Sequence, residues 1–562
     1  MKTLRLRFYY MHAIFLYLIL LLPSQLNAQS NNKLENDITS VMMHATKFFA
    51  DSVSENGGFV SHYLPDFSRR WGEMEAYPSM VWTQNPGTVS MGNIFLGAYF
   101  ATHNEYYYTQ AKKAADALVW GQLPCGGWNY FINFAGQNST LQWYNTIGKN
   151  GWRLEEFQHY YGNATFDDET TSDAAFFLLR FYLTKLDPAY KTPVEKVISL
   201  VLKSQYPIGG WPQRYPLRHD FNKSGHPDYT SFYTFNDNVI WQNIKFLITC
   251  YATLNYHDKF YEGGDSELLD AVRRGMNFIL LAQQPKPFAG WGQQYTMDLA
   301  PAGARTYEPK SLDPQYTAGN ILILIKCYEL TGDRRYIERI PDAIDWLKSA
   351  ELKDTNKKGV YIYAKFVDPE TGCPLYTHRI GSNVISGHYY VDSDSNNTVA
   401  HYRNFRMIDL GGVENYYNKI LSEKPDSVTF GSPLIPGNNS ANSLIKRYDE
   451  VTDYLKLTDI YGFNFEINKN LVEKIISSLD KEGRWLVKGM QTSNPYIGEP
   501  KEDDSNTKKY MTTYVGDKYD TSPYRDKSDQ EYISTGVYTF NMRVLINYLN
   551  EIKNGTEGKY KN

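Results

Sequence analysis

Apolar residues recur at helical spacing in consecutive pairs of segments along most of the chain. The clear pairs are residues 89–101 with 106–120, 171–184 with 194–204, 237–255 with 267–282, and 317–330 with 336–350. Apolar positions three and four residues apart form one face of a helix, which must be covered by another element. The pattern therefore predicts a series of helical hairpins.

A short phrase ending in Gly-Trp recurs at the end of successive hairpins. It ends at Trp128, Trp211 and Trp291, with intervals of 83 and 80 residues. A fixed period of this length indicates a repeated supersecondary unit. One hairpin cannot bury its apolar face alone, so the copies stack as an open solenoid or close as a ring. We predict an all-α fold, an α/α toroid of repeated helical hairpins with short β elements in the rim loops.

The composition changes after the last clear hairpin. Residues 359–366 are rich in β-branched and aromatic side chains, which favours a strand. Residues 422–440 are rich in Pro, Gly, Ser and Asn, as linkers are. We predict a toroid catalytic domain over residues 29–424 and a C-terminal extension over residues 425–562, in which a further helical hairpin closes the toroid.

The first residues have the pattern of a secretory signal. A charged start is followed by an apolar run over residues 13–22 and by Leu26-Asn27-Ala28 as a cleavage context. The apolar run is too short to span a bilayer. We therefore expect residues 1–28 to be a signal peptide and the mature protein to be secreted or periplasmic, without a membrane span.

Composition narrows the possible partners. A net charge of -4 gives no overall attraction to nucleic acid or to an acidic membrane. The chain contains 47 Tyr and 11 Trp, and large flat side chains either stack on sugar rings or fill helix interfaces. Packing is the favoured interpretation for any single aromatic residue, including Trp211 and Trp291, and stacking on sugar is the alternative. The four cysteines are scattered and form no CxxC pair, which argues against a metal–thiolate site.

Two polar clusters that contain acids lie where loops meet the starts of predicted helices. Asp167, Asp168 and Glu169 stand before the helix at residues 171–184. A helix cap explains one acid at such a position, but three adjacent acids exceed this need, and their oxygens suit a hard cation such as Ca²⁺. Asp237 follows Asp167 by 70 residues, about one repeat. The two acids are expected to point at the same rim, although a cap also explains Asp237 alone.

A third polar cluster follows Trp291. It includes Gln294 and the segment 301–309, which contains Arg305 and Glu308. Arg305 could simply pair with Glu308 in a surface loop. Alternatively, its planar guanidinium could bind the carboxylate of an acidic sugar beside a metal ion.

Three ordered segments carry a family resemblance. They are residues 209–216 (Gly-Gly-Trp-Pro-Gln-Arg-Tyr-Pro), residues 234–238 (Thr-Phe-Asn-Asp-Asn) and residues 291–309. Together they resemble the pectate lyases of polysaccharide lyase family 10, over roughly residues 165–365. The resemblance implies an α/α toroid, calcium-assisted cleavage of polygalacturonate by β-elimination, and an arginine as catalytic base.

The resemblance also assigns roles to individual residues. It implies that Asp167 and Asp237 bind Ca²⁺ and that Arg305 takes the proton from the substrate. The side chains expected to contact the substrate are Asp168, Asn236, Asn238, Trp211, Tyr215, Trp291, Gln294 and Arg379. The expected partner is an acidic polysaccharide, polygalacturonate or a related uronate glycan, bound by a monomer.

Two alternatives remain open from the sequence. An α/α toroid glycoside hydrolase would use Asp167 and Asp237 as acid and base around a water molecule. A catalytically inactive protein that binds acidic polysaccharides is favoured by another observation. Family 10 lyases carry basic residues after the strand-like segment, whereas residues 380–402 contain no Lys or Arg.

Overall fold

The computed structural model describes most of the chain. The described residues are 32–152, 154–218, 228–254, 264–352, 361–380, 388–396, 398, 405–435, 441–459, 466–493 and 520–554. Within them, none of the helices is both long and apolar enough to cross a membrane. Cys125, Cys250, Cys327 and Cys373 are all free thiols.

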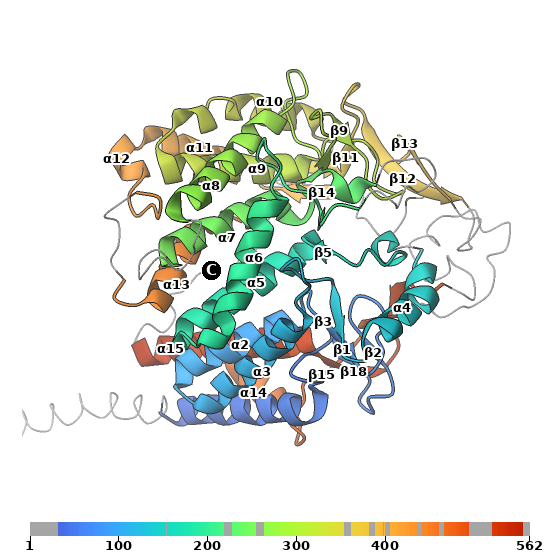
Figure 1. The fold of residues 1–562 in the computed structure, drawn as a ribbon, viewed down its shortest axis with the longest axis vertical. Coiled ribbons are helices and arrows are strands. Elements are labelled where there is room, and N and C mark those ends of the chain that lie inside the picture. The colour runs from blue at the N-terminus through green and yellow to red at the C-terminus, as the bar shows by residue number, and fades with distance from the viewer. Residues whose placement is uncertain are drawn as a thin grey trace, which may run out of the picture.

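Helical hairpins follow one another along the chain, as predicted. They are α2 (Thr88–Thr102) with α3 (Glu105–Gly121), α5 (Thr170–Lys185) with α6 (Lys191–Ser204), α7 (Val239–Leu254) with α8 (Gly264–Ala282), and α9 (Pro314–Thr331) with α10 (Ile340–Ala350). Helix α2 contacts α5, α5 contacts α7, and α8 contacts α9. Figure 1 shows this array rising from α2 and α3 to α9 and α10.

The C-terminal helices return along the same array and rejoin its beginning (Figure 1). They are α11 (Leu410–Ser422), α12 (Pro425–Val428), α13 (Leu444–Tyr454), α14 (Lys469–Ser478) and α15 (Thr535–Asn554). Helix α11 contacts α9, α13 contacts α5 and α7, and α15 contacts both α14 and α2. The last helix thus packs on the first hairpin, and the fold is the predicted helix-rich α/α toroid. A domain boundary at residue 425 stays a prediction.

The strands are short and lie in the loops between helices. The first hairpins contribute β3 (Met80–Trp82) paired with β4 (Phe131–Asn133), β5 (Ala164–Thr165) with β6 (Arg214–Tyr215), and β7 (Tyr233–Thr234) with β8 (Gln294–Tyr295) and β9 (Pro301–Ala302). Later strands are β10 (Tyr361–Ala364) paired with β14 (Phe405–Ile408), and the sheet of β11 (Phe366–Val367), β12 (Pro374–Ile380) and β13 (His388–Asp392). Strand β10 lies within the segment predicted as a strand, of which residues 359 and 360 are outside the described residues.

One sheet joins the two ends of the described chain. It has the order β15 (Leu486–Lys488), β18 (Glu531–Ser534), β1 (His62–Tyr63) and β2 (Arg70–Trp71). Strands β1 and β18 are antiparallel, with His62 opposite Ser534. Next to them, β16 (Gln491–Ser493) pairs with β17 (Pro523–Arg525). Residues more than 400 positions apart in the sequence therefore share one rim of the molecule.

The repeated tryptophans hold the loops to the helices. Trp128, Trp211 and Trp291 are fully buried. Their indole N–H groups donate to the carbonyl oxygens of Leu118, Val201 and Ile279. The prediction that Trp211 and Trp291 contact a substrate is therefore wrong, because burial and these hydrogen bonds leave no ring face open.

Because Trp291 is fully buried, Trp291→Ala should destabilise the fold by about 3–5 kcal/mol, through lost apolar burial and the cavity left behind. Trp120→Ala is the matched control, since Trp120 is 57% exposed and should cost much less. Urea unfolding followed by circular dichroism measures both variants. Equal losses of stability would contradict the role given to the buried tryptophans.

Candidate active site

Two loops of successive hairpins have the same backbone conformation. The short helix η4 (Asp167–Glu169) follows β5, and η7 (Asn236–Asn238) follows β7. Asp168 and Asp237 have φ angles of 48° and 49°. This left-handed region is uncommon for residues other than glycine, although Asp and Asn tolerate it. The repeat therefore matches Asp237 to Asp168, which shifts the equivalence predicted from the sequence by one residue.

Asp167, Asp237 and Arg305 meet in the structure, although they come from three separate loops. The Arg305 Nη2 atom lies 2.7 Å from Asp167 Oδ2. The carboxyl groups of Asp167 and Asp237 are hydrogen-bonded to each other. Helices η4 and η7 are in contact, which explains how the two repeats bring their acids together.

The oxygens of Asp167 are already engaged. Tyr130 donates its hydroxyl to Oδ2 at 2.5 Å, and the Gln213 amide donates to Oδ1. Asp167 is fully buried, whereas Asp168 and Asp237 are half-buried. Asp167 thus holds Arg305 in place through their ion pair. Asp168 and Asp237, the equivalent acids of the two repeats, are the ones that solvent can reach.

Carboxylates enclose Arg305. Besides Asp167, its Nε atom lies 2.9 Å from Glu156 Oε2, and its Nη1 atom lies 3.3 Å from Glu308 Oε1. Burial alone would lower the pKa of Arg305, but these carboxylates raise it well above its usual value. Arg305 is therefore protonated in this arrangement. The Glu308 pair was one of the two sequence interpretations, but it is buried and does not lie in a surface loop.

Carboxyl groups outnumber the guanidinium at this site. Six of them interact electrostatically with Arg305: Glu73, Glu156, Asp167, Asp168, Asp237 and Glu308. Burial, together with the neighbouring acids, raises the pKa of Glu156 to about 8 and raises the pKa values of Asp168 and Asp237 well above normal. Burial is the largest single influence on Asp167 and raises its pKa, but Arg305 and the hydrogen bonds with Asp237, Tyr130 and Gln213 together outweigh it and lower the pKa of this carboxyl. The cluster therefore holds protons at neutral pH.

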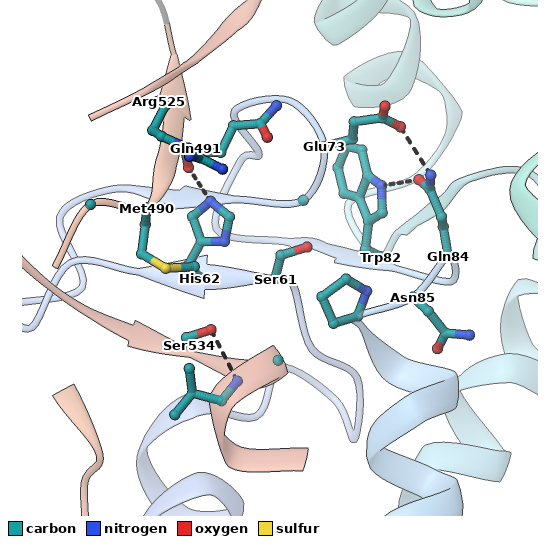
Figure 2. Close-up of a pocket in the computed structure, with 15 residues that line it drawn as sticks. Ser61, His62, Glu73, Trp82, Gln84, Asn85, Met490, Gln491, Arg525 and Ser534 are labelled. Carbon is teal, nitrogen blue, oxygen red and sulfur yellow. Dashed lines mark hydrogen bonds between the residues drawn. The ribbon is translucent and has the colours of Figure 1, made fainter. Parts of the chain in front are cut away.

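Gln84 connects Asp168 to a further acid. Its amide nitrogen donates to Asp168 Oδ2 at 2.7 Å and to Glu73 Oε2 at 3.0 Å. The Trp82 indole donates to the Gln84 amide oxygen at 2.9 Å, which fixes the orientation of the amide. Figure 2 shows the contacts of Trp82 and Glu73 with Gln84. Glu73 and Gln84 could not be identified from the sequence, because they precede the repeats that carry the polar clusters.

The two predicted asparagines connect protein groups. The Asn236 amide donates to Asp237 Oδ2 at 2.5 Å, and its oxygen accepts a hydrogen bond from the Tyr316 hydroxyl at 2.9 Å. Asn238 donates to Glu169 Oε1 at 3.0 Å, which joins the two repeated loops. Asn236 thus positions Asp237, and its amide groups are not left open for a substrate.

The remaining predicted contacts differ in exposure. Gln294 is buried on β8, and its amide nitrogen and oxygen have no hydrogen-bond partner among the described residues, so its contact with a substrate stays a prediction. Arg379 is also buried, with its guanidinium carbon 3.5 Å from the centre of the Trp152 ring, so it presents no open fork to a carboxylate. Tyr215 is half-buried on β6 and stays a candidate.

A pocket of about 640 Å³ opens beside Arg305. Tyr229, Thr306 and Tyr389 are among its walls. Behind it, the buried guanidinium of Arg214 lies 4.7 Å from the ring centre of Tyr161, another wall residue. Within the described residues, Arg214 Nη2 has no hydrogen-bond partner. Arg214 lies in the quoted motif at 209–216, but nothing in the sequence marked it as a candidate site residue by itself.

The acids suit a calcium ion in their chemistry. Ca²⁺ takes six to eight oxygen ligands, and the half-buried carboxylates of Asp168 and Asp237 are such ligands. In the described part of the chain, no three His, Cys, Asp or Glu side chains form a preassembled metal site. A calcium ion held by these two acids would need substrate and water to complete its coordination shell.

Residues 137–395 match the family model for pectic acid lyase. This match confirms the resemblance found in the sequence. The pectic acid lyase segment contains Asp167, Asp237 and Arg305, whereas Glu73 and Gln84 precede it. The family match supports a polysaccharide lyase.

Solved structures with similar folds have low identity to the chain. A mutant family 10 polysaccharide lyase from Cellvibrio cellulosa, in complex with trigalacturonic acid, is 17% identical, with a TM-score of 0.39, covering 58% of this chain and 98% of that one. An α-1,6-mannanase from Salegentibacter is 9% identical, with a TM-score of 0.33, covering 94% and 100%. No curated protein matches the chain.

Glu156 should make stability depend on pH. Its pKa rises from 4.5 to about 8 on folding, so the folded state keeps a proton that the unfolded state loses. Its contribution to stability is therefore full below about pH 4.5 and is lost as the pH rises to about 8. Glu156→Gln should flatten the fall of the melting temperature in this window.

Glu267→Gln is the control for this measurement, because Glu267 is an exposed carboxylate at the start of α8. Differential scanning calorimetry between pH 4.5 and 8 compares the three proteins. An unchanged slope in Glu156→Gln would show that Glu156 is not the proton-holding group.

Proposed function

We propose that this protein is a secreted polysaccharide lyase that cleaves pectate by calcium-assisted β-elimination. The observation that carries the proposal is the contact of Asp167, Asp237 and Arg305 beside a pocket, inside the segment that matches pectic acid lyase. A fold alone would not support it, since similar folds host unrelated reactions.

The reaction removes the proton on C5 of a uronate and breaks the bond to the oxygen on C4. The carbon acid is weak, so charge that develops on the neighbouring carboxylate must be stabilised. Asp168 and Asp237 offer the accessible oxygens for a cation, and Asp167 holds Arg305 in place. When bound, Ca²⁺ would supply positive charge at the substrate carboxylate and offset the charge of these acids.

Arg305 is the proposed proton acceptor, as the resemblance implies. Only its neutral form can take a proton, and the surrounding carboxylates keep that form scarce. The reaction should therefore run faster as the pH rises. Fewer negative charges around Arg305 should have the same effect as a higher pH.

The contact between the acids bears on the glycoside hydrolase alternative. Hydrolases place their two carboxyl groups about 5–9.5 Å apart. The hydrogen bond between Asp167 and Asp237 brings them closer than that range, which favours the lyase. An inactive polysaccharide-binding protein would differ from the lyase and from the hydrolase because it would form no cleavage product.

Incubation with polygalacturonate and Ca²⁺ at mildly alkaline pH should produce unsaturated oligosaccharides, measured as a rise in ultraviolet absorbance. EDTA should abolish the rise. Asp237→Asn should lower kcat/KM roughly a hundredfold or more, because it removes a carboxylate from the reaction centre. Asp187→Asn is the control, since Asp187 is a half-buried cap of the short helix η5 (Pro188–Tyr190) and is not part of the carboxyl cluster.

Reducing ends without the double bond would identify a hydrolase and contradict the proposal. Binding of polygalacturonate without any cleavage, with or without Ca²⁺, would leave the inactive binding protein as the function.

Glu308→Gln tests the role of Arg305. If Arg305 takes the proton, loss of one facing carboxylate should shift the pH–rate profile to lower pH by about one unit or more. Glu370→Gln is the matched control, because Glu370 is exposed and pairs with Lys310 in a nearby segment. A lower rate at every pH without a shift of the profile would mean that Arg305 supplies positive charge but does not accept the proton.

A further inference from the structure

A second pocket, of about 530 Å³, lies on the other side of Gln84. Its walls come from β1, from the loop that contains Glu73 and Gln84, and from the C-terminal strands β16 and β17 (Figure 2). All of these residues lie outside 137–395, so the pectic acid lyase segment contributes none of them.

This pocket adjoins the carboxyl cluster. Glu73 and Gln84 form part of its wall, and the Gln84 amide is hydrogen-bonded to Asp168. The first pocket adjoins the same cluster, because Arg305 lines that pocket and forms an ion pair with Asp167. The acids therefore lie between two pockets. A polymer bound for cleavage in its interior needs sites on both sides of the bond that breaks.

His62 offers this second pocket a hydrogen-bond acceptor. Its Nε2 atom contacts the Gln491 carbonyl oxygen, which only accepts, so the proton of the neutral ring lies on Nε2. Burial lowers the pKa of His62 to about 4, so the ring is neutral at neutral pH. Its Nδ1 atom is buried and faces the Ser61 backbone, and it forms no hydrogen bond of good geometry among the described residues. Figure 2 shows this nitrogen turned toward Ser61. A sugar hydroxyl is a suitable donor to it.

Arg525 offers the pocket a positive charge. It lines the pocket from the end of β17 and is exposed. Among the residues that the structure describes, it forms no hydrogen bond or ion pair through its side chain. Figure 2 places it beside Gln491, on the same side as His62. A planar guanidinium without a protein partner matches a carboxylate in geometry and charge.

We propose that this pocket is a subsite for a uronate unit of the polymer, in which Arg525 binds the carboxylate and His62 accepts a hydrogen bond from a hydroxyl. The inference rests on the proposed lyase function for the nature of the polymer. It adds that residues from both ends of the chain extend the substrate cleft beyond the pectic acid lyase segment.

Arg525→Gln tests the subsite. Its KM for hexagalacturonate should rise roughly fivefold, as expected for loss of one charge-assisted contact at an exposed position. Its kcat should not change, and its KM for trigalacturonate should change little, because a short substrate can react without filling this pocket. Lys527→Gln is the matched control, since it removes the same charge two residues away and does not line the pocket.

Isothermal titration calorimetry with hexagalacturonate in EDTA gives a readout that does not need activity. Weaker binding by Arg525→Gln than by Lys527→Gln would support the subsite even if no cleavage is seen, and the lyase proposal would then fail alone. Equal effects of the two variants, or none, in a protein that cleaves polygalacturonate would overturn the subsite.

His62→Phe, checked for folding by its melting temperature, should also weaken hexagalacturonate binding, and unchanged binding would remove His62 from the proposal.

Discussion

The site depends on the confinement of many carboxyl groups around one guanidinium. Arg305 can neutralise only part of this charge, and burial prevents water from screening the rest. Buried charges that are not paired are costly, so the protein lowers the cost by keeping some acids protonated. An arriving cation would relieve the same strain. The crowding of acids thus costs stability and would favour a bound cation at this place on the rim.

The duplicated loop explains how two such acids come to lie together. Each copy places an aspartate in the left-handed backbone region, directly before a long helix of the toroid. Because successive hairpins stack side by side, equivalent side chains of neighbouring copies come close without any special long-range contact. The repeat is therefore both the architecture of the fold and the source of the acid pair.

The helices and their order could be predicted from the sequence, because apolar periodicity and the Gly-Trp phrase are local signals. The meeting of Asp167, Asp237 and Arg305 also followed from the repeat and the resemblance. The burial of Gln294 could not be predicted, since an amide side chain in a loop looks the same whether it faces solvent or a helix. Glu73 and Gln84 were missed because they reach the acids only through tertiary contacts.

The sheet that joins β1 to β18 makes the second pocket depend on an intact C-terminal segment. The second pocket needs residues from near both ends of the described chain, so translation must almost finish before that wall exists. A shortened product that ended at residue 425 would keep the whole pectic acid lyase segment but would lose the partner helix of the first hairpin. Proteolytic clipping in the C-terminal segment would act in the same way, so under the proposed function the integrity of this segment would decide how much of a long polymer the protein can hold.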